Sequence, residues 1–265
     1  MERPTFELPS ALDYLDEIYH PDKKRIPVVF LDYDGTLTPI VEHPDNAILS
    51  TAMREAVRRL AEKTTVAVIS GRDRENVMNL VNLSEIFYAG SHGFDISGPH
   101  GTRIEFEQNK SHLASLTEAA ALLEERLKDI PGSQVERKKY AVAIHFRRVA
   151  PKSHDRVEQI VDEVHRGFSN LRKTGGKMIH ELRPDMDWHK GKAVGWLLKA
   201  LKISPSQALP IYIGDDLTDE DAFKELYDYG IGILVREENR LTAARYTLDN
   251  TDEVRRFLEN LHQVI

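Results

Sequence analysis

Four short apolar runs restrict how this chain can fold more than any other feature of its sequence. They are residues 28–31, 66–69, 86–89 and 211–213, and none of them alternates with polar residues. A strand that is apolar on both faces must be covered on both faces, which is typical of a parallel sheet between two layers of helices. Helical spacing of apolar residues is found between or after these runs, at 53–61, 194–201 and 254–261. The sequence therefore predicts the α/β class, with a doubly wound, Rossmann-like parallel sheet.

The middle of the chain, residues 109–184, shows a different pattern. Its expected order is a helix with an apolar face from 113 to 127, strands at 135–139 and 141–148, a helix at 153–167, and strands that flank Gly175 and Gly176. In the strand at 141–148, His145 and Arg147 alternate with apolar residues and are expected on the same uncovered face. We therefore expect a smaller α+β cap domain at 109–184, inserted into a core built from 1–108 and 185–265.

Composition excludes several classes of function. The 265 residues carry a formal net charge of −7, which argues against broad nucleic-acid binding and requires any phosphate site to build its own local positive charge. No run approaches the roughly 18 apolar residues of a membrane span, and the N-terminal residues do not resemble a signal peptide. Because the chain has no cysteine, disulfides and thiolate metal sites are excluded. We expect a cytoplasmic, monomeric protein whose partner is a small molecule rather than nucleic acid or a membrane.

Two carboxylates follow the first apolar run directly. Asp32 and Asp34 precede Gly35 at the expected carboxyl end of a parallel strand, where ligands of open α/β sheets bind. One carboxylate could attack phosphorus while the other protonates the leaving oxygen. The alternative is an ordinary Asp-x-Asp-Gly turn, which is common. An apolar strand that leads straight into two acids is costly unless a cation neutralises them, and this favours a functional site.

A second acidic cluster follows the last apolar run. Asp215, Asp219 and their acidic neighbours offer hard oxygen ligands, which suit Mg²⁺. The alternative is helix capping, with Thr218 as the N-cap and Asp219, Glu220 and Asp221 in the first turn. Both interpretations can hold together if Asp215 binds the metal. Two acidic strand ends in one chain favour a shared metal site.

Two further segments could contact a phosphate. Ser70, Gly71 and Arg72 follow the second apolar run and offer a hydroxyl, backbone amides and a guanidinium, although Ser-Gly is also ordinary turn chemistry. Lys190 stands at the start of a predicted helix, where its charge opposes the helix dipole. That small penalty is understandable if Lys190 faces a phosphate and the acidic cluster. The alternative is a solvated pair with Lys192.

In chain order, these residues resemble the four motifs of the haloacid dehalogenase superfamily. The matching residues are Asp32-x-Asp34, Ser70, Lys190 with Gly191 after it, and Gly214-Asp215-Asp216. The resemblance covers essentially the whole chain, and the insertion between the second and third motifs is similar to the type C2B cap of that superfamily. Further segments resemble the trehalose-6-phosphate phosphatase family, at 70–72, 90–93, 145–147, 177–184 and 214–220.

The resemblance implies a role for each matching residue of the core. Asp32 would be the nucleophile, and Asp34 the general acid that later activates water. The cofactor Mg²⁺ would be bound by Asp32, Asp34 (through its backbone carbonyl) and Asp215, with the supporting residues Thr36, Asp216 and Asp219 nearby. The phosphate would be held by Ser70, Gly71, Arg72 and Lys190. An acid at position 34 also favours phosphatase or mutase chemistry over the chemistry of the superfamily's ATPases and dehalogenases.

In the insertion, the resemblance implies that Arg147, Lys177 and Glu181 contact a sugar. The implied reaction is the hydrolysis of trehalose 6-phosphate to trehalose and inorganic phosphate, through an aspartyl-phosphate intermediate that depends on Mg²⁺. This would be the last step of trehalose biosynthesis. The alternatives are a phosphatase of sucrose phosphate or of a glycosyl phosphoglycerate, a mutase-like enzyme, and a non-catalytic sugar-phosphate sensor. The sensor is disfavoured because every acid and base position of the motifs is filled.

Overall fold

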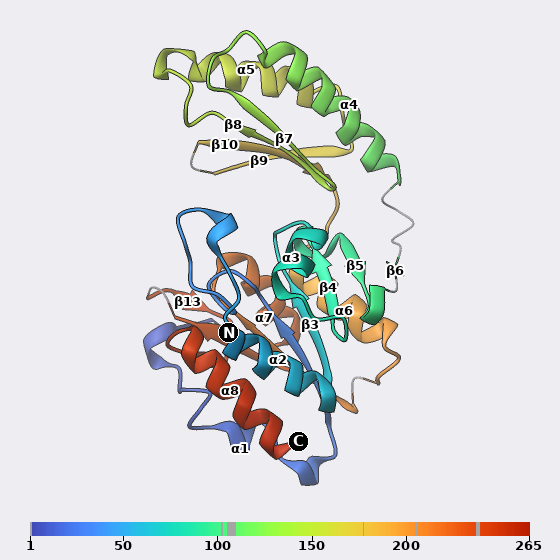
Figure 1. The fold of residues 1–265 in the computed structure, drawn as a ribbon, viewed down its shortest axis with the longest axis vertical. Coiled ribbons are helices and arrows are strands. Elements are labelled where there is room, and N and C mark those ends of the chain that lie inside the picture. The colour runs from blue at the N-terminus through green and yellow to red at the C-terminus, as the bar shows by residue number, and fades with distance from the viewer. Residues whose placement is uncertain (1, 102, 105–109, 177, 205, 237–238) are drawn as a thin grey trace. The chain divides into compact units, whose positions relative to one another are not determined.

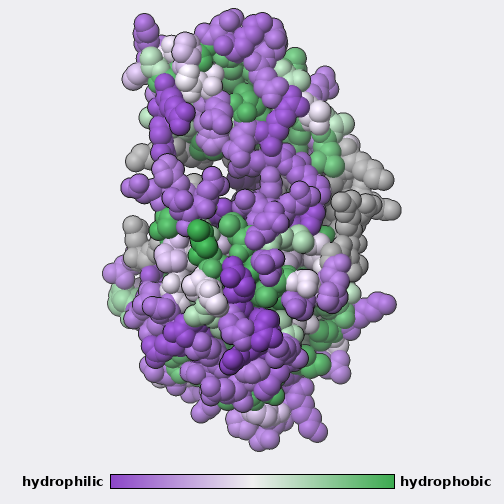
Figure 2. Space-filling model, in the orientation of Figure 1, coloured by the Kyte–Doolittle hydropathy of each residue, from purple (hydrophilic) through white to green (hydrophobic). Residues whose placement is uncertain are grey.

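The computed structural model describes residues 2–101, 103–104, 110–176, 178–204, 206–236 and 239–265. The chain divides into two compact units (Figure 1). The first unit comprises Met1–Ile104 and Trp188–Ile265, and the second comprises Glu105–Asp187. Among the described residues, every helix is too short or too polar to span a bilayer. On the face drawn in Figure 2, hydrophilic residues cover most of the surface.

The first unit contains an eight-stranded sheet of order β14-β12-β11-β2-β3-β4-β5-β6. The strands from β14 to β4 run parallel, whereas β5 and β6 are added in antiparallel pairing. Their bounds in sheet order are Tyr246–Leu248, Ile231–Val235, Ala208–Gly214, Ile26–Leu31, Thr65–Ile69, Phe87–Gly90, Asp95–Ser97 and Arg103–Ile104. All four predicted runs therefore lie in adjacent parallel strands. β12 and the short strands β5, β6 and β14 are not among them.

Helices cover both faces of this sheet. One face packs on α1 (Leu15–Ile18), α2 (Thr51–Lys63), α3 (Arg74–Val81) and α8 (Thr251–Val264), and the other on α6 (Lys190–Ala200) and α7 (Glu220–Leu226). In β2, Val29 belongs to the first of these apolar cores and Phe30 to the second. Successive side chains of a strand point to opposite faces, so a continuous apolar run is what a doubly covered strand requires. The predicted doubly wound α/β core is confirmed.

The second unit is a four-stranded antiparallel sheet with helices on one face. Its strand order is β7-β8-β10-β9, and its core joins residues of the sheet to residues of both helices. The bounds are α4 (Lys110–Leu127), β7 (Gln134–Lys138), β8 (Ala141–His145), α5 (His154–His165), β9 (Leu171–Gly176) and β10 (Ile179–Pro184). The expected α+β order is therefore present.

One detail of the expected second unit is wrong. β8 ends at His145, so Arg147 lies in the following turn and not on a strand face shared with His145. The turn is closed by the amide of Val149, which donates to the carbonyl of Phe146 at 3.0 Å. The Phe146 ring stacks on His180, with ring centroids 4.9 Å apart. The amide of Phe146 still donates to the carbonyl of Met178 at 3.2 Å, and the turn that follows ends the strand pattern before Arg147.

The N-terminal segment is tied to the connection between β12 and β14 of the first unit. β1 (Arg3–Pro4) pairs antiparallel with β13 (Leu241–Thr242). Further along, the amide of Ala11 donates to the carbonyl of Thr247, and the amide of Thr247 donates to the carbonyl of Pro9, both at 2.9 Å. The segment therefore runs beside the chain between β12 and α8.

Candidate active site

Asp32 stands at the carboxyl end of β2, beside the end of β11. Its amide donates to the carbonyl of Ile213 at 2.9 Å, so the two strand ends are joined at this point. Gly35 follows with φ +80°, and its amide donates to the carbonyl of Thr38 at 2.8 Å. A Cβ at Gly35 would come within 2.0 Å of the Asp215 carboxylate. Glycine therefore provides the turn and also lets the acid of the second strand end approach.

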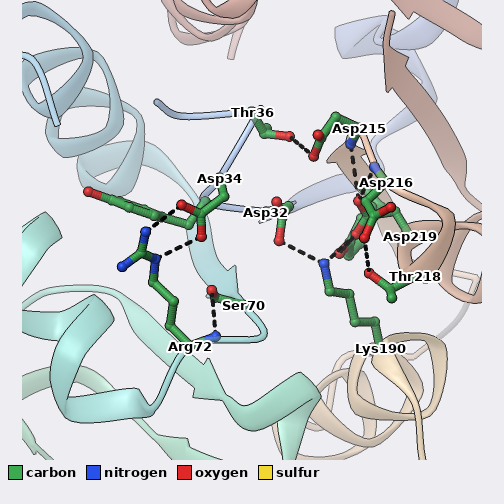
Figure 3. Close-up of polar contacts among 12 residues, drawn as sticks. Asp32, Asp34, Thr36, Ser70, Arg72, Lys190, Asp215, Asp216, Thr218 and Asp219 are labelled. Atoms are coloured by element: carbon green, nitrogen blue, oxygen red, sulfur yellow. Dashed lines mark hydrogen bonds and ion pairs between the residues drawn. The ribbon is translucent and has the colours of Figure 1, made fainter. Parts of the chain in front are cut away.

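Lys190 joins two carboxylates in the centre of the site (Figure 3). Its ammonium donates to Oδ1 of Asp32 and to Oδ1 of Asp219, each at 2.7 Å, and only 3% of its side chain is exposed. Burial alone would lower the pKa of this lysine, but Asp219 and Asp32 outweigh it and raise the pKa above its ordinary value. Lys190 is thus a buried permanent cation in contact with the predicted nucleophile.

Asp219 organises the acidic strand end. Besides Lys190, its Oδ1 accepts a hydrogen bond from the Tyr212 hydroxyl at 2.6 Å. Its Oδ2 accepts from the backbone amides of Asp215 and Asp216, both at 3.0 Å. Each oxygen therefore accepts two donors, and Asp219 is a positioning group. Tyr212 is absent from the sequence-based set, although a phenol in an otherwise apolar run two residues before Gly214 is a detectable signal.

The donor set of this cluster fits a hard divalent cation. One carboxylate oxygen from each of Asp32, Asp215 and Asp219 lies within 4.8 Å of the others, and all three residues are buried. Burial raises the pKa of Asp32 to about 7; Lys190 lowers it, while Asp219 raises it further. A divalent cation would offset this excess of buried negative charge. Since both oxygens of Asp219 already accept donors, Asp32 and Asp215 are the carboxylates best suited to bind Mg²⁺.

The two predicted supporting residues beside Asp215 have different surroundings. Thr36 is fully buried, and its hydroxyl donates to Oδ1 of Asp215 over a long 3.5 Å. Asp216 is exposed, and its carboxylate accepts from the amide of Leu217 at 2.6 Å, at the start of the 3₁₀ turn Leu217–Asp219. Capping by Asp216 and a metal role for Asp215 are therefore compatible.

Arg72 contacts the predicted general acid. Its Nε and Nη2 donate to the two oxygens of Asp34 at 2.7 and 2.6 Å, and the guanidinium lies 5.4 Å from the centroid of the Tyr33 ring. The hydrogen bonds from Arg72 to Asp34 raise the pKa of Arg72. The guanidinium thus makes a two-pronged contact with Asp34, and the phosphate contact expected for Arg72 stays a prediction. In the view of Figure 3, this pair and Lys190 lie on opposite sides of Asp32.

Ser70 and Gly71 lie at the end of β3, next to β4. The amide of Ser70 donates to the carbonyl of Ala89 at 2.9 Å, and its hydroxyl accepts from the amide of Arg72 at 3.1 Å. A Cβ at Gly71 would lie 2.9 Å from Cε1 of His92. His92 therefore packs directly over Gly71, which only a residue without a side chain allows.

The predicted sugar residues belong to the second unit. Glu181 is buried on β10; Lys138 of β7 donates to its Oε1 at 3.1 Å, and Arg183 pairs with its Oε2. Arg147 is exposed in its turn, and Lys177 lies outside the described residues. Lys138 is absent from the sequence-based set, because nothing local in its charged strand shows that it pairs with a residue 43 positions away.

Comparison with solved structures identifies the class of fold. A crystal structure of a trehalose-6-phosphate phosphatase related protein matches with a TM-score of 0.74 and 26% identity, and covers 89% of this chain and 97% of that one. A trehalose-6-phosphate phosphatase of Aspergillus fumigatus matches with a TM-score of 0.69 and 26% identity, over 97% of this chain and 100% of that one. The fold is that of the haloacid dehalogenase class, as the sequence indicates.

Sequence comparison identifies the family within that class. The family model for trehalose-phosphatase matches residues 30–252. The chain is 43% identical to a trehalose 6-phosphate phosphatase of Zea mays, over 96% of this chain and 74% of that protein. It is 42% identical to trehalose-phosphate phosphatase B of Arabidopsis thaliana, over 96% of this chain and 71% of that protein. The chain belongs to the trehalose-phosphatase family.

Proposed function

We propose that this chain hydrolyses trehalose 6-phosphate to trehalose and inorganic phosphate, with Asp32 as the nucleophile. One observation carries the proposal: Asp32 and Asp34 follow β2 two residues apart, and each is held by a different cation, Lys190 and Arg72 respectively. Two carboxylates in distinct environments suit two different chemical roles. Membership of the trehalose-phosphatase family, whose relatives are named for this substrate, supports the choice of sugar phosphate.

In the first step, an Oδ atom of Asp32 forms a bond to phosphorus while the bond from phosphorus to the sugar oxygen breaks. Asp34 gives a proton to that oxygen, and trehalose leaves. Lys190 stabilises the negative charge that spreads over the phosphoryl oxygens. Because both oxygens of Asp34 accept hydrogen bonds from Arg72, the carboxyl group must leave this fork, at least in part, to carry a proton to the sugar oxygen.

In the second step, water attacks the phosphorus of the acyl phosphate and Asp34 takes its proton. The bond from phosphorus to Asp32 breaks, which regenerates the Asp32 carboxylate and releases inorganic phosphate. Here the ionised Asp34 is the active form, and the fork from Arg72 holds it in a defined orientation. We propose that Ser70, and the backbone at Gly71, hold the phosphoryl oxygens through both steps.

We propose that the acidic cluster binds Mg²⁺. Asp32 and Asp215 would bind it through carboxylate oxygens and Asp34 through its backbone carbonyl, with Thr36, Asp216 and Asp219 in support. Bound Mg²⁺ supplies electrostatic stabilisation of the transferring phosphoryl group. The oxygen donor set and the raised pKa of Asp32 support this choice.

Substrate selection is assigned to the second unit. We propose that it acts as a C2B-type cap domain, in which Glu181, Arg147 and Lys177 contact the sugar. The contacts of Lys138 and Arg183 with Glu181 support its role as a fixed hydrogen-bond acceptor for sugar hydroxyl groups. We further propose that the protein works in the cytoplasm as a monomer. The absence of cysteine from all 265 residues supports a reducing compartment.

A phosphate-release assay tests the proposal. The panel contains trehalose 6-phosphate, sucrose phosphate, glucose 6-phosphate and a small aryl phosphate, each with Mg²⁺ and with EDTA. We expect trehalose 6-phosphate to be preferred and EDTA to abolish release until Mg²⁺ is restored. The Asp32→Asn variant should keep its far-ultraviolet circular dichroism and lose turnover. Normal turnover by that variant would refute the covalent mechanism, and a preference for another sugar phosphate would refute the substrate assignment.

A further inference from the structure

Arg240 reaches the acidic strand end from the side opposite Asp219. Its Nη2 donates to the backbone carbonyl of Asp215 at 3.0 Å and to that of Asp216 at 3.2 Å. Its Nη1 donates to Oε1 of Glu220 at 2.6 Å. The side chain is 20% exposed, so these contacts are partly shielded from water. No motif used in the sequence analysis includes Arg240.

Asp215 and Asp216, at the metal side of the site, are thus held through both their backbone amides and their backbone carbonyls. Asp219 accepts the amides of Asp215 and Asp216, and Arg240 donates to the carbonyls of the same two residues. With both its donor and its acceptor engaged, the peptide of Asp215 has little freedom to rotate. The direction in which the Asp215 carboxylate leaves the backbone is set by this peptide.

Arg240 is itself fixed at its backbone and at its guanidinium. The hydroxyl and the amide of Thr5 both donate to the Arg240 carbonyl, at 2.8 and 2.9 Å, and Thr5 is fully buried. Oε2 of Glu220 accepts from the amide of Ala243 at 2.8 Å, which anchors the carboxylate that Arg240 contacts. The N-terminal segment, the connection between β12 and β14, and the metal side of the site therefore form one connected hydrogen-bond network.

We propose that Arg240 is a positioning residue for metal binding: it holds the Asp215 peptide so that the Asp215 carboxylate meets the cation. Thr5 secures Arg240 in this role. The inference rests on the proposed function, in which Asp215 binds Mg²⁺. Residues that orient metal ligands in other proteins change metal affinity by about 10- to 100-fold when they are replaced.

Whether replacement of Arg240 weakens or tightens metal binding separates a positioning role from simple electrostatics. Removal of a guanidinium from the neighbourhood of a bound cation reduces repulsion and, by Coulomb's law alone, would tighten metal binding. Loss of the hydrogen bonds from Arg240 to the Asp215 and Asp216 carbonyls would instead weaken metal binding. The variant Arg240→Lys keeps the charge but cannot reproduce the fork on Glu220 and two carbonyls, so it isolates the geometric contribution.

The experiment measures metal binding directly. Chelator-treated Arg240→Lys, Arg240→Gln and Thr5→Val proteins are titrated with Mg²⁺ by calorimetry and with Mn²⁺ by electron paramagnetic resonance. Arg236, whose side chain pairs with Asp249 at the surface, provides the matched controls Arg236→Lys and Arg236→Gln. Tryptophan fluorescence checks the fold, since Trp188 and Trp196 both belong to the first unit.

We expect both Arg240 variants to raise the metal Kd about tenfold, with Thr5→Val changing it in the same direction and the controls leaving it unchanged. In phosphate release, kcat at saturating Mg²⁺ should stay near the wild-type value while the Mg²⁺ concentration for half-maximal rate rises. An unchanged or tighter Kd in Arg240→Lys would overturn the proposal, and so would a lower kcat that saturating Mg²⁺ does not restore. A wild-type protein that binds no metal would instead refute the proposed function itself.

Discussion

The replacement Asp219→Asn is predicted to destabilise the first unit strongly although it changes no side-chain shape. Asp219 is fully buried and accepts four hydrogen bonds, from Lys190, Tyr212 and the amides of Asp215 and Asp216. An asparagine keeps only one of the two acceptor oxygens. Its NH₂ group replaces the other oxygen and faces the two donors that this oxygen had accepted. Whichever way the amide is oriented, two donors lose their acceptor.

The size of the effect follows from the contacts that are lost. Lys190 keeps Asp32 as a partner in this variant, so its charge is not left unpaired. Two lost hydrogen bonds to a charged group, at about 1.5–3 kcal/mol each, cost about 3–6 kcal/mol. We therefore expect the free energy of unfolding of the first unit to fall by about 3–6 kcal/mol. At about 2–4 °C per kcal/mol for a unit of this size, the melting temperature should fall by roughly 6–24 °C.

The assay is urea unfolding in EDTA, followed by tryptophan fluorescence. Both tryptophans, Trp188 and Trp196, lie in the first unit, so this signal reports its unfolding. The matched control is Asp216→Asn, the same chemical change three residues earlier at an exposed N-cap. Asparagine caps as well as aspartate, so the control should lose less than about 1 kcal/mol. Equal stability of the two variants would refute the view that Asp219 organises the acidic strand end.

Three further predictions concern catalysis. Glu181→Ala should lower kcat/KM for trehalose 6-phosphate by about 10- to 100-fold while sparing a small aryl phosphate, and equal losses on both would remove Glu181 from the sugar site. Lys138→Met should show the same selectivity with a smaller loss, because Arg183 still holds the other oxygen of Glu181; full activity on both substrates would show that Lys138 is dispensable. Arg72→Gln should slow hydrolysis of the acyl phosphate by about tenfold or more, because Asp34 is no longer held, so that rapid quenching finds phosphorylated enzyme accumulating. An unchanged steady-state level of phosphorylated enzyme would contradict that role of Arg72.

The sequence predicted the core sheet because its information is local. Runs such as 28–31 and 211–213 are apolar without alternation, and a doubly covered parallel strand requires that pattern. Parallel strands also place their carboxyl ends at one edge, so Asp32 and Asp215 could be expected to meet before the register of Leu31 with Ile213 was known. The short strands β5, β6 and β14 were not predicted, since two or three residues show no period.

The partners of the charged groups were decided only by the tertiary structure. The sequence gives Arg72 a plausible phosphate role, whereas in the fold its guanidinium meets both oxygens of Asp34, 38 residues away. Arg147 was expected to share a strand face with His145, but the strand ends at His145 and Arg147 lies in the turn closed by the amide of Val149 and the carbonyl of Phe146. A strand that ends in an acid can be seen in consecutive residues of the sequence. An ion pair cannot, because it depends on the distance between segments that are far apart in the chain. For this reason the sequence alone predicted roles for Asp32 and Asp34 and a lysine, Lys190, that faces an acidic cluster. The fold decided which carboxylates Lys190 and Arg72 contact, and that Arg240 holds the neighbouring Asp215 peptide.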